Sequence, residues 1–198
     1  MKKTATAGEM NAKVIPALEE YGVNPDDGHV LWASDKAVLL DLKSYLENKN
    51  HVLDDVGSVT DFVIQSDVTW ETSGALSLCG ITFHADEDIE QGAQNRFFMM
   101  RLQFDPGWTI WKWEYGQFQS YLTGGWSSSR DIHDENGDKN TLGLVVRGKD
   151  IDVYINRDFQ RRVEDAKLKE GQLALSAFQE SGSTKCRFMN TWVWVFDN

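Results

Sequence analysis

From His29 onward, apolar and polar residues alternate in short runs, the pattern of half-buried β-strands. The clearest run is 60–70, in which Phe62, Ile64 and Val68 fall on one face and Gln65 and Asp67 on the other. Further runs are separated by turn residues, and they span 30–32, 38–42, 76–85, 96–104, 108–115, 118–122, 142–146, 151–155, 172–178 and 186–196. Because no helical crossover separates these runs, we expect antiparallel strands in a sandwich or barrel.

The first 28 residues have a different pattern. Pro16 precedes the sequence Ala-Leu-Glu-Glu-Tyr, and Gly22 follows it, which predicts a short helix with proline at its start and glycine just past its end. A turn is expected at 24–28. Residues 1–28 are therefore interpreted as a lead-in that either docks on the domain or belongs to a linker, and residues 29–198 as one domain.

Composition and charge narrow the classes of partner. The 198 residues include 31 acidic and 20 basic side chains, for a net charge of −11. This field disfavours nucleic acids and anionic membrane surfaces as partners. The sequence contains no run of about 18 apolar residues, so it predicts no membrane span. Residues 1–3 resemble the charged start of a secretory signal, but 4–11 supply no apolar segment, so a cytoplasmic chain and a processed secreted chain both remain open.

Cys79 and Cys186 are the two cysteines, and each lies in a predicted strand. Two cysteines fall short of the four ligands of a zinc site. They are either two buried reduced thiols that pack as small hydrophobes or a disulfide that joins two strands.

The second half of the chain carries a spaced set of residues that resembles a known superfamily. These positions are Asn140-x-Leu142, the turn glycine Gly148, Tyr154-x-Asn156, Asp165, Gly171 before a strand, and Phe188-x-Asn190. Upstream, residues 61–63 and 80–83 resemble the opening strands of the same domains. Over about residues 58–197 the chain is similar to the concanavalin A-like lectin/glucanase jelly rolls, especially laminin-G-like and 3-keto-disaccharide-hydrolase-like bacterial modules. The hairpin tip departs from their pattern, because Arg157 stands where glycine is usual, so we expect a different turn there.

This resemblance implies an all-β, two-sheet antiparallel jelly-roll sandwich with one concave and one convex sheet, preceded here by the short helical lead-in. Members of the superfamily are often secreted and often bind glycans, and some hydrolyse them. The fold by itself does not choose among these roles.

Glycoside hydrolysis requires two carboxylates placed across a sugar. Jelly-roll glucanases carry a Glu-x-Asp-x-Glu strand, and the nearest match here is Asp86, Asp88 and Glu90, which alternate along 86–90. Gln91-Gly92 then ends the run, so an acidic solvated loop is favoured over a catalytic set. Asp165 is interpreted in the same way, because basic residues surround it in the sequence.

A second polar segment spaces oxygen atoms two residues apart, as calcium loops do. Its candidate ligands are Asp134, Asn136 and Asp138. The glycine stands two positions early for an EF-hand and no glutamate closes the loop. A polar turn whose side chains bind their own backbone is the alternative.

Aromatic residues cluster within a stretch of nineteen residues. They are Trp108, Trp111, Trp113, Tyr115, Phe118, Tyr121 and Trp126. Trp108 shares a strand face with Lys112, whose burial without a partner would be costly. We therefore expect Trp111 and Trp113 to pack in the core, and a ring among Trp108, Tyr121 and Trp126 to be exposed for stacking on a sugar.

The leading hypothesis is a non-catalytic, lectin-like carbohydrate-recognition module of a secreted or cell-surface bacterial protein. Its predicted ligand-binding residues are Gln65, Asp67, His84, Arg101, Gln103, Trp108, Tyr121 and Trp126. The alternatives are an extracellular protein–protein or self-assembly module and a glycoside hydrolase-like enzyme. The expected partner is a glycan, with another protein or a second copy as alternatives, and no cofactor is expected other than calcium.

Overall fold

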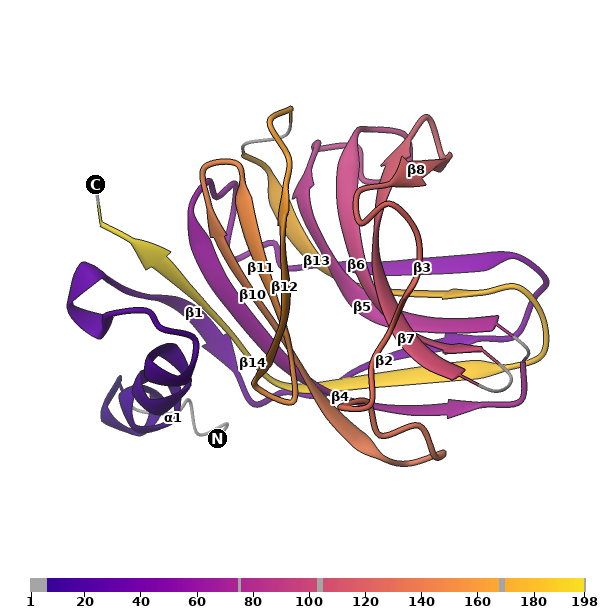
Figure 1. Ribbon diagram of the computed structural model, residues 1–198, viewed down its shortest axis with the longest axis horizontal. Helices are drawn as coiled ribbons and strands as arrows, with labels where there is room; N and C mark the ends of the chain where they lie inside the picture. Colours follow the sequence, from indigo (N-terminus) through magenta and orange to yellow (C-terminus); the bar gives the residue numbers. More distant parts are fainter. Residues whose placement is uncertain (1–6, 75, 103–104, 168–169, 198) are drawn as a thin grey trace.

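The computed structural model of the chain describes residues 7–74, 76–102, 105–167 and 170–197. In this part of the chain, two antiparallel sheets of seven strands each pack face to face, and one α-helix precedes them (Figure 1). This confirms the all-β, two-sheet jelly-roll sandwich with a helical lead-in. Among the described residues, no helix has the length and apolar content that a membrane crossing requires.

Sheet A has the strand order β1-β14-β4-β10-β11-β12, with β2 also paired to β14. Its strands are β1 (Gly28–Ser34), β2 (Val38–Leu42), β4 (Phe62–Thr72), β10 (Lys139–Arg147), β11 (Asp150–Ile155), β12 (Asp158–Glu164) and β14 (Thr184–Phe196). Sheet B has the order β3-β13-β5-β6-β7-β8, with β9 on β7. Its strands are β3 (Glu47–Val52), β5 (Leu76–Ala85), β6 (Gln94–Leu102), β7 (Asp105–Glu114), β8 (Gln117–Tyr121), β9 (Ser127–Ser128) and β13 (Gln172–Gln179).

Alternating side chains from the two inner faces form the main core, as the periodicity predicts. On β4, Phe62, Ile64 and Val68 are fully buried in this core. A disulfide between Cys79 on β5 and Cys186 on β14 joins the two sheets through it. Of the two alternatives for the cysteines, the structure therefore has the disulfide.

A bulge in β14 changes which residues of this strand face the core. Before it, Cys186 and Phe188 point inward, and after it Val193 and Val195 do so. The pairing with β4 shifts register between Met189 and Trp192. An extra residue in one strand re-aims the side chains that follow. The bulge therefore turns Trp192 and Trp194 to the outer face of sheet A, where a second apolar cluster forms.

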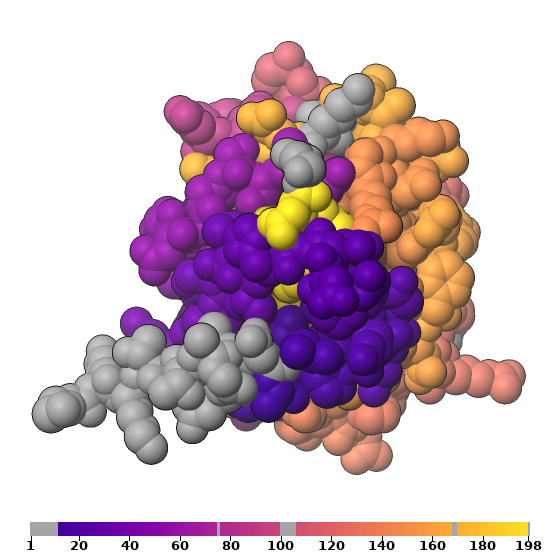
Figure 2. Space-filling view, turned by 90° about the vertical axis from the view of Figure 1, so that its left-hand side faces the viewer, coloured from indigo at the N-terminus to yellow at the C-terminus, as the bar shows by residue number. Residues whose placement is uncertain are grey.

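Helix α1 (Ala7–Glu20) lies on this outer face beside β1 and β14, and a 3-10 turn, η1 (Pro25–Asp27), connects it to β1 (Figure 1). Figure 2 looks onto this end of the molecule and shows the indigo N-terminal segment covering it. Five buried residues of the segment belong to one cluster with Val63, Val145, Tyr154, Trp192 and Trp194. They are Val14, Ala17, Leu18, Tyr21 and Val23. The Tyr154 hydroxyl also donates to the backbone oxygen of Tyr21 (3.0 Å).

Pro16 lies inside α1 rather than at its start, so the predicted helix start is wrong. Ala7, Glu9 and Met10 favour helix upstream of the proline. The proline costs one hydrogen bond, since it has no N–H to donate to the carbonyl of Ala12. Packing of the next turn on sheet A compensates for this loss.

The β7 strand presents the opposite face to the core from the one predicted. Trp108 is 2% exposed and packs in the main core, whereas Trp111 and Trp113 lie on the outer face of sheet B. Lys112 does not prevent this, because its ammonium pairs with the buried carboxylate of Asp165 at 3.0 Å. The prediction that Asp165 lies in a solvated charged loop is wrong for the same reason.

The start of β7 also differs from the prediction. Residues 105–107, expected as a turn, belong to this strand and pair with 100–102 of β6. Pro106 fits here because proline is tolerated near the start of a strand.

The outer face of sheet B is largely filled by its own side chains. Leu78, Phe98 and Trp111 form a buried cluster, and other rings pack on it. The guanidinium of Arg96 stacks over the Trp113 ring at 4.1 Å and is fully buried. This packing covers the outer face of sheet B around Trp111 and Trp113.

Candidate functional site

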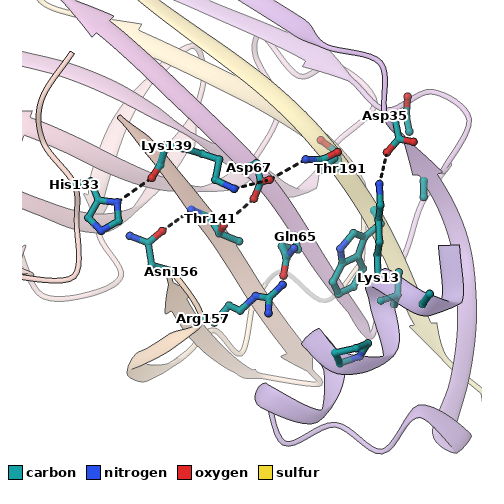
Figure 3. Close-up of a pocket in the computed structure, with 17 residues that line it drawn as sticks. Lys13, Asp35, Gln65, Asp67, His133, Lys139, Thr141, Asn156, Arg157 and Thr191 are labelled. Atoms are coloured by element: carbon teal, nitrogen blue, oxygen red, sulfur yellow. Dashed lines mark hydrogen bonds and ion pairs between the residues drawn. The ribbon is translucent and has the colours of Figure 1, made fainter. Parts of the chain in front are cut away.

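A pocket of about 480 Å³ lies on the outer face of sheet A, between α1 and the tip of the β11–β12 hairpin (Figure 3). It is lined by Ala12, Lys13, Val14, Pro16, Ala33, Ser34, Asp35, Gln65, Asp67, His133, Lys139, Thr141, Asn156, Arg157, Asn190, Thr191 and Trp192. The lining combines charged, amide and hydroxyl groups with one indole and the apolar α1 residues Ala12, Val14 and Pro16. Pockets of this size and mixed polarity are typical of small-molecule sites.

The carboxylate of Asp67 in the pocket is held by three donors. Thr141 Oγ1 donates to its Oδ1 (2.7 Å), and Asn190 Nδ2 donates to its Oδ2 (2.9 Å). Lys139 Nζ lies 3.5 Å from Oδ2. These partners come from β10 and β14, the two strands that flank β4 in sheet A. The carboxylate is therefore held in one orientation, with one of its four lone-pair sites left for a ligand.

Three side chains of the pocket stand on backbone in the left-handed region. They are Asn156 (φ 53°), Arg157 (φ 72°) and Asn190 (φ 49°). Asn190 belongs to the β14 bulge, which points its amide at Asp67. Asn156 and Arg157 form the tip of the β11–β12 hairpin, and positive φ at both positions is what a type I′ turn requires. Such backbone is uncommon for residues other than glycine, and its concentration at one pocket is a feature of functional sites.

The turn at the β11–β12 tip therefore has the same backbone conformation with Arg157 as it would have with the usual glycine. The expectation of a different turn there is wrong. Arginine adopts the conformation that glycine usually supplies, at some cost in backbone strain. Arg157 gains an ion pair with Glu20 of α1 (3.0 Å) in exchange.

Gln65 forms the floor of the pocket beside Asp67 (Figure 3). The hydroxyl of Tyr21 donates to its Oε1 at 2.8 Å. Burial raises the pKa of Tyr21 far above its ordinary value, and the phenol stays protonated well into the alkaline range. Among the described residues, the hydrogen bond from Tyr21 to Oε1 is the one that the Gln65 side chain makes, so Nε2 offers its donors to the pocket that Gln65 lines.

The predicted ligand-binding residues do not share one face. Gln65 and Asp67 lie on the outer face of sheet A and line the pocket, whereas His84 and Arg101 belong to β5 and β6 of sheet B. Only the backbone of Arg101 is described, and Gln103 lies outside the described residues. Alternation identifies the residues that share a face of one strand, but it does not assign strands to sheets.

The sequence predicts His84 on a polar strand face and an exposed ring among Trp108, Tyr121 and Trp126. The first prediction is wrong, whereas the second is confirmed by Tyr121, although Trp108 itself is buried. His84 is 1% exposed, and its ring packs edge-on against Phe62 and Phe83. Its positive φ of 50° interrupts the alternation of β5 and turns the ring inward. Trp108 packs edge-on against Phe97 in the core.

The other two predicted aromatic residues lie on sheet B, away from the pocket. Tyr121 on β8 is 44% exposed and contacts Phe118. Trp126 is half-buried against the cluster around Trp111. The indole that lines the pocket is instead that of Trp192.

The acidic residues proposed as weak catalytic candidates lie in an exposed loop after β5 and build its turns. Asp86 Oδ2 accepts from the backbone N–H of Ala93 (2.8 Å). Asp88 Oδ1 accepts from the N–H groups of Glu90 and Gln91, each at 3.1 Å. These contacts are those of a solvated loop, and none of the three residues lines the Asp67 pocket.

The side chains of segment 134–138 bond to the backbone. Asn136 Oδ1 accepts from the N–H of Thr72 (3.0 Å), and Asp138 Oδ2 accepts from the N–H of Glu135 (3.1 Å). Within the described ranges, no group of three or more His, Cys, Asp or Glu residues is arranged to hold a metal ion. Calcium binding by Asp134, Asn136 and Asp138 stays a prediction.

Several residues of the pocket were not predicted as ligand contacts, although two carried a signal. Asn156 and Asn190 belong to the spaced pattern that suggests the jelly roll, and both line the pocket. Thr141, Lys139 and the residues of α1 give no such signal, because their contribution depends on strand order and helix docking.

Comparison with known proteins supports the fold. No protein-family model matches the chain, and no curated protein matches it in sequence. Among solved structures, the carbohydrate-binding module CBM66 from Bacillus subtilis is 16% identical, with a TM-score of 0.60 over 83% of this chain and 96% of that one. A Bacillus subtilis protein of unknown function with a galectin-like fold is 13% identical (TM-score 0.56; 86% and 89% covered). The endo-β-1,3-glucanase from Pyrococcus furiosus is 10% identical (TM-score 0.56; 88% and 80% covered). The chain therefore has the concanavalin A-like jelly-roll fold.

Proposed function

We propose that the protein is a non-catalytic carbohydrate-recognition module of a secreted or cell-surface bacterial protein, and that it binds a saccharide in the Asp67 pocket. The observation that carries this proposal is the pairing of an oriented carboxylate, Asp67, with an unpartnered amide donor, Gln65 Nε2, on the same face of β4. A sugar hydroxyl can donate to the carboxylate while a second hydroxyl accepts from the amide.

The rest of the lining fits a saccharide as well. Lys139 and Arg157 supply further donors at the rim, and Asn190 supplies an amide. The exposed α1 residues Ala12 and Pro16 offer apolar surface for the C–H groups of a sugar ring, whereas Trp192, at 4% exposure, adds little open ring surface to the lining. The carbohydrate-binding module among the similar structures is consistent with this chemistry, although a fold shared at 16% identity does not by itself assign a function.

The disulfide supports the proposed location. Cys79–Cys186 lies in the core between the sheets, and structural disulfides are characteristic of oxidising compartments. A secreted or cell-surface protein meets polysaccharides directly.

Isothermal titration calorimetry with laminari-, cello-, galacto- and fructo-oligosaccharides tests the proposal. We expect one class to bind, and Asp67→Asn to weaken its binding by roughly 10- to 100-fold, because hydrogen bonds to a charged group are lost. Glu71→Gln is the matched control, since Glu71 lies on β4 and pairs with Lys185 outside the pocket. Failure of every oligosaccharide to bind, or equal binding by Asp67→Asn and the wild type, would overturn the proposal.

A hydrolytic role has less support. The carboxylates of the pocket are Asp35, paired with Lys13 at 3.2 Å, and Asp67, held by its three donors. Both are engaged as orienting groups, and the acidic run at 86–90 is used in loop turns. Release of reducing ends from any oligosaccharide of the panel would favour the enzyme alternative.

Self-association is favoured by one separate observation. Phe118 and Tyr121 on β8 are 41% and 44% exposed and contact each other, at the edge of sheet B. Exposed rings of this kind also serve protein interfaces. The molecular mass in solution tests this second function. A mass that rises with the concentration of the wild type, and that stays at the monomer value in Phe118→Ser, would support it.

A further inference from the structure

We propose that α1 is part of the saccharide site, and that Tyr21 is a positioning residue that fixes the donor end of Gln65 toward the ligand. This inference rests on the function proposed above and extends it, because it makes the N-terminal segment a determinant of which sugar is bound. Residues from α1 supply one wall of the pocket, opposite the side formed by the β11–β12 hairpin (Figure 3).

The first argument is the orientation of the Gln65 amide. A glutamine amide has an acceptor end and a donor end of nearly equal size, and its neighbours decide which end faces a ligand. Here the buried Tyr21 hydroxyl occupies the acceptor end at 2.8 Å. Without this contact, Gln65 could turn its oxygen to the pocket and place two acceptors, its own and that of Asp67, side by side.

The second argument is the close fit of the Tyr21 ring on sheet A. Gly143 on β10 is paired with Gln65, and a Cβ atom at this glycine would lie 2.5 Å from Tyr21 Oη. Glycine therefore provides the space through which the phenol reaches Gln65. The hydroxyl position is set by the sheet surface as well as by the helix.

The third argument concerns Pro16, which lies inside α1 and lines the pocket together with Ala12. The carbonyl of Ala12 receives no hydrogen bond from residue 16, because proline has no N–H. Pro16 and Ala12 contribute apolar surface to the helix wall of the pocket.

The attachment of α1 explains why its docking and ligand binding are coupled. The ion pairs Lys13–Asp35 and Arg157–Glu20 tie the helix to both sides of the pocket, but all four side chains are largely exposed and such pairs contribute little. The apolar contacts of α1 and the Tyr21 hydroxyl hold the helix instead. A ligand that touches both α1 and sheet A binds the docked state and stabilises it.

The structure offers a matched pair of variants for the test. Tyr21 and Tyr154 have ring centroids 4.4 Å apart, and both hydroxyls join the residue that follows α1 to sheet A. Only the Tyr21 hydroxyl contacts a residue of the pocket, since the Tyr154 hydroxyl donates to the backbone oxygen of Tyr21. Tyr21→Phe and Tyr154→Phe thus remove the same group from the same interface.

Two measurements on the full chain separate positioning from structural support. In ligand-free protein, the side-chain amide signals of Gln65 in ¹⁵N NMR spectra should shift or broaden in Tyr21→Phe and stay unchanged in Tyr154→Phe. With the tightest-binding oligosaccharide of the laminari-, cello-, galacto- and fructo-series, Tyr21→Phe should weaken binding about three- to tenfold, as expected for one neutral hydrogen bond. Discrimination against one of the monodeoxy analogues of that oligosaccharide should fall by a similar factor, because an unoriented amide no longer distinguishes the hydroxyl that it binds.

The outcomes distinguish this inference from the proposed function. If the wild type binds an oligosaccharide and both tyrosine variants bind it with unchanged affinity and selectivity, the positioning role of Tyr21 is overturned and the saccharide site stands. Equal losses in both variants, with unchanged Gln65 signals, would also overturn it, since helix docking alone would then account for the effect. Absence of binding by the wild type contradicts the saccharide function, and the Gln65 signals still decide whether Tyr21 orients the amide.

Discussion

The ammonium of Lys112 and the carboxylate of Asp165 form an ion pair of 3.0 Å at the edge of the sandwich interior. Asn95 Nδ2 (2.9 Å) and the backbone N–H of Lys167 (2.9 Å) also donate to this carboxylate. The pair explains how β7 can place Trp108 and Ile110 in the core, although the next residue on that face is a lysine. The carboxylate of Asp165 thus compensates the positive charge that Lys112 brings to the inner face of β7.

Replacing Asp165 with Asn should lower the free energy of unfolding by about 2 kcal/mol, because the half-buried ammonium of Lys112 loses its counter-charge. Chemical denaturation at pH 7 measures this change. Glu164→Gln is the control, since Glu164 pairs with exposed Lys149 at the surface, and it should have little effect. Equal stability of the two variants would show that the ion pair does not support the fold.

Asp165 also predicts a loss of stability in acid. Burial by itself raises the pKa of Asp165, but the hydrogen bonds from Asn95, Lys167 and Lys112 outweigh it and hold the pKa below the ordinary value of 3.8. A carboxyl whose pKa is lower in the folded state stabilises the protein above the unfolded pKa, and this contribution is lost as the pH falls through the folded pKa. Below pH 4, the stability of the wild type should therefore fall more steeply than that of Asp165→Asn.

The disulfide should contribute a large part of the stability. Cys79 and Cys186 are separated by 107 positions, and removing a cross-link over a loop of this length costs about 2–5 kcal/mol. We expect the double variant Cys79→Ala/Cys186→Ala, and the wild type after reduction, to show similar decreases in melting temperature. Alkylation of the denatured, unreduced protein should label neither cysteine, whereas labelling of both would mean that they are reduced thiols.

The periodicity of the sequence is sufficient to predict the sandwich and most inner faces, because strand alternation is a local property. Phe62, Ile64 and Val68 are buried as the pattern on β4 predicts. Errors arise where one residue breaks the alternation, as His84 does with its positive φ. They also arise where a distant partner compensates a charge, as Asp165 does for Lys112.

The candidate site is predicted only in part, for a related reason. Gln65 and Asp67 are identified as a polar strand face, and this face does line the pocket. The neighbours that complete it come from strands far apart in the sequence and from the bulge at Asn190. Tyr21 was assigned to a lead-in segment, and nothing local to it indicates that its hydroxyl reaches β4.

His84 should make stability depend on pH above the range of the carboxyl groups. Burial lowers the pKa of His84 below the ordinary value of 6.5, and this effect outweighs the hydrogen bond from its ring to the backbone of Thr60. The unfolded chain then binds a proton near pH 6.5 that the folded protein does not, so stability decreases as the pH falls below that value.

The variant His84→Asn tests this directly, since asparagine tolerates the positive φ of this position. Urea denaturation between pH 7 and pH 5 should show a smaller decrease in the variant than in the wild type. The other histidines are present in both proteins, and the difference between the two slopes therefore reports on His84. Parallel slopes would contradict a buried neutral imidazole.

Asn190 allows the backbone of the β14 bulge to be separated from its side chain. Asn190→Gly keeps a residue suited to a φ of 49° but removes the amide that donates to Asp67, whereas Asn190→Ala removes the same amide and adds backbone strain. Asn190→Gly should thus retain stability to within about 1 kcal/mol, and Asn190→Ala should lose about 1 kcal/mol more. Both should weaken oligosaccharide binding by a similar factor, about three- to tenfold, because Asp67 loses the same partner in each. Calorimetric titration and denaturation of the two variants measure the two effects, and binding losses that followed the stability losses instead would assign Asn190 a purely structural role in the bulge.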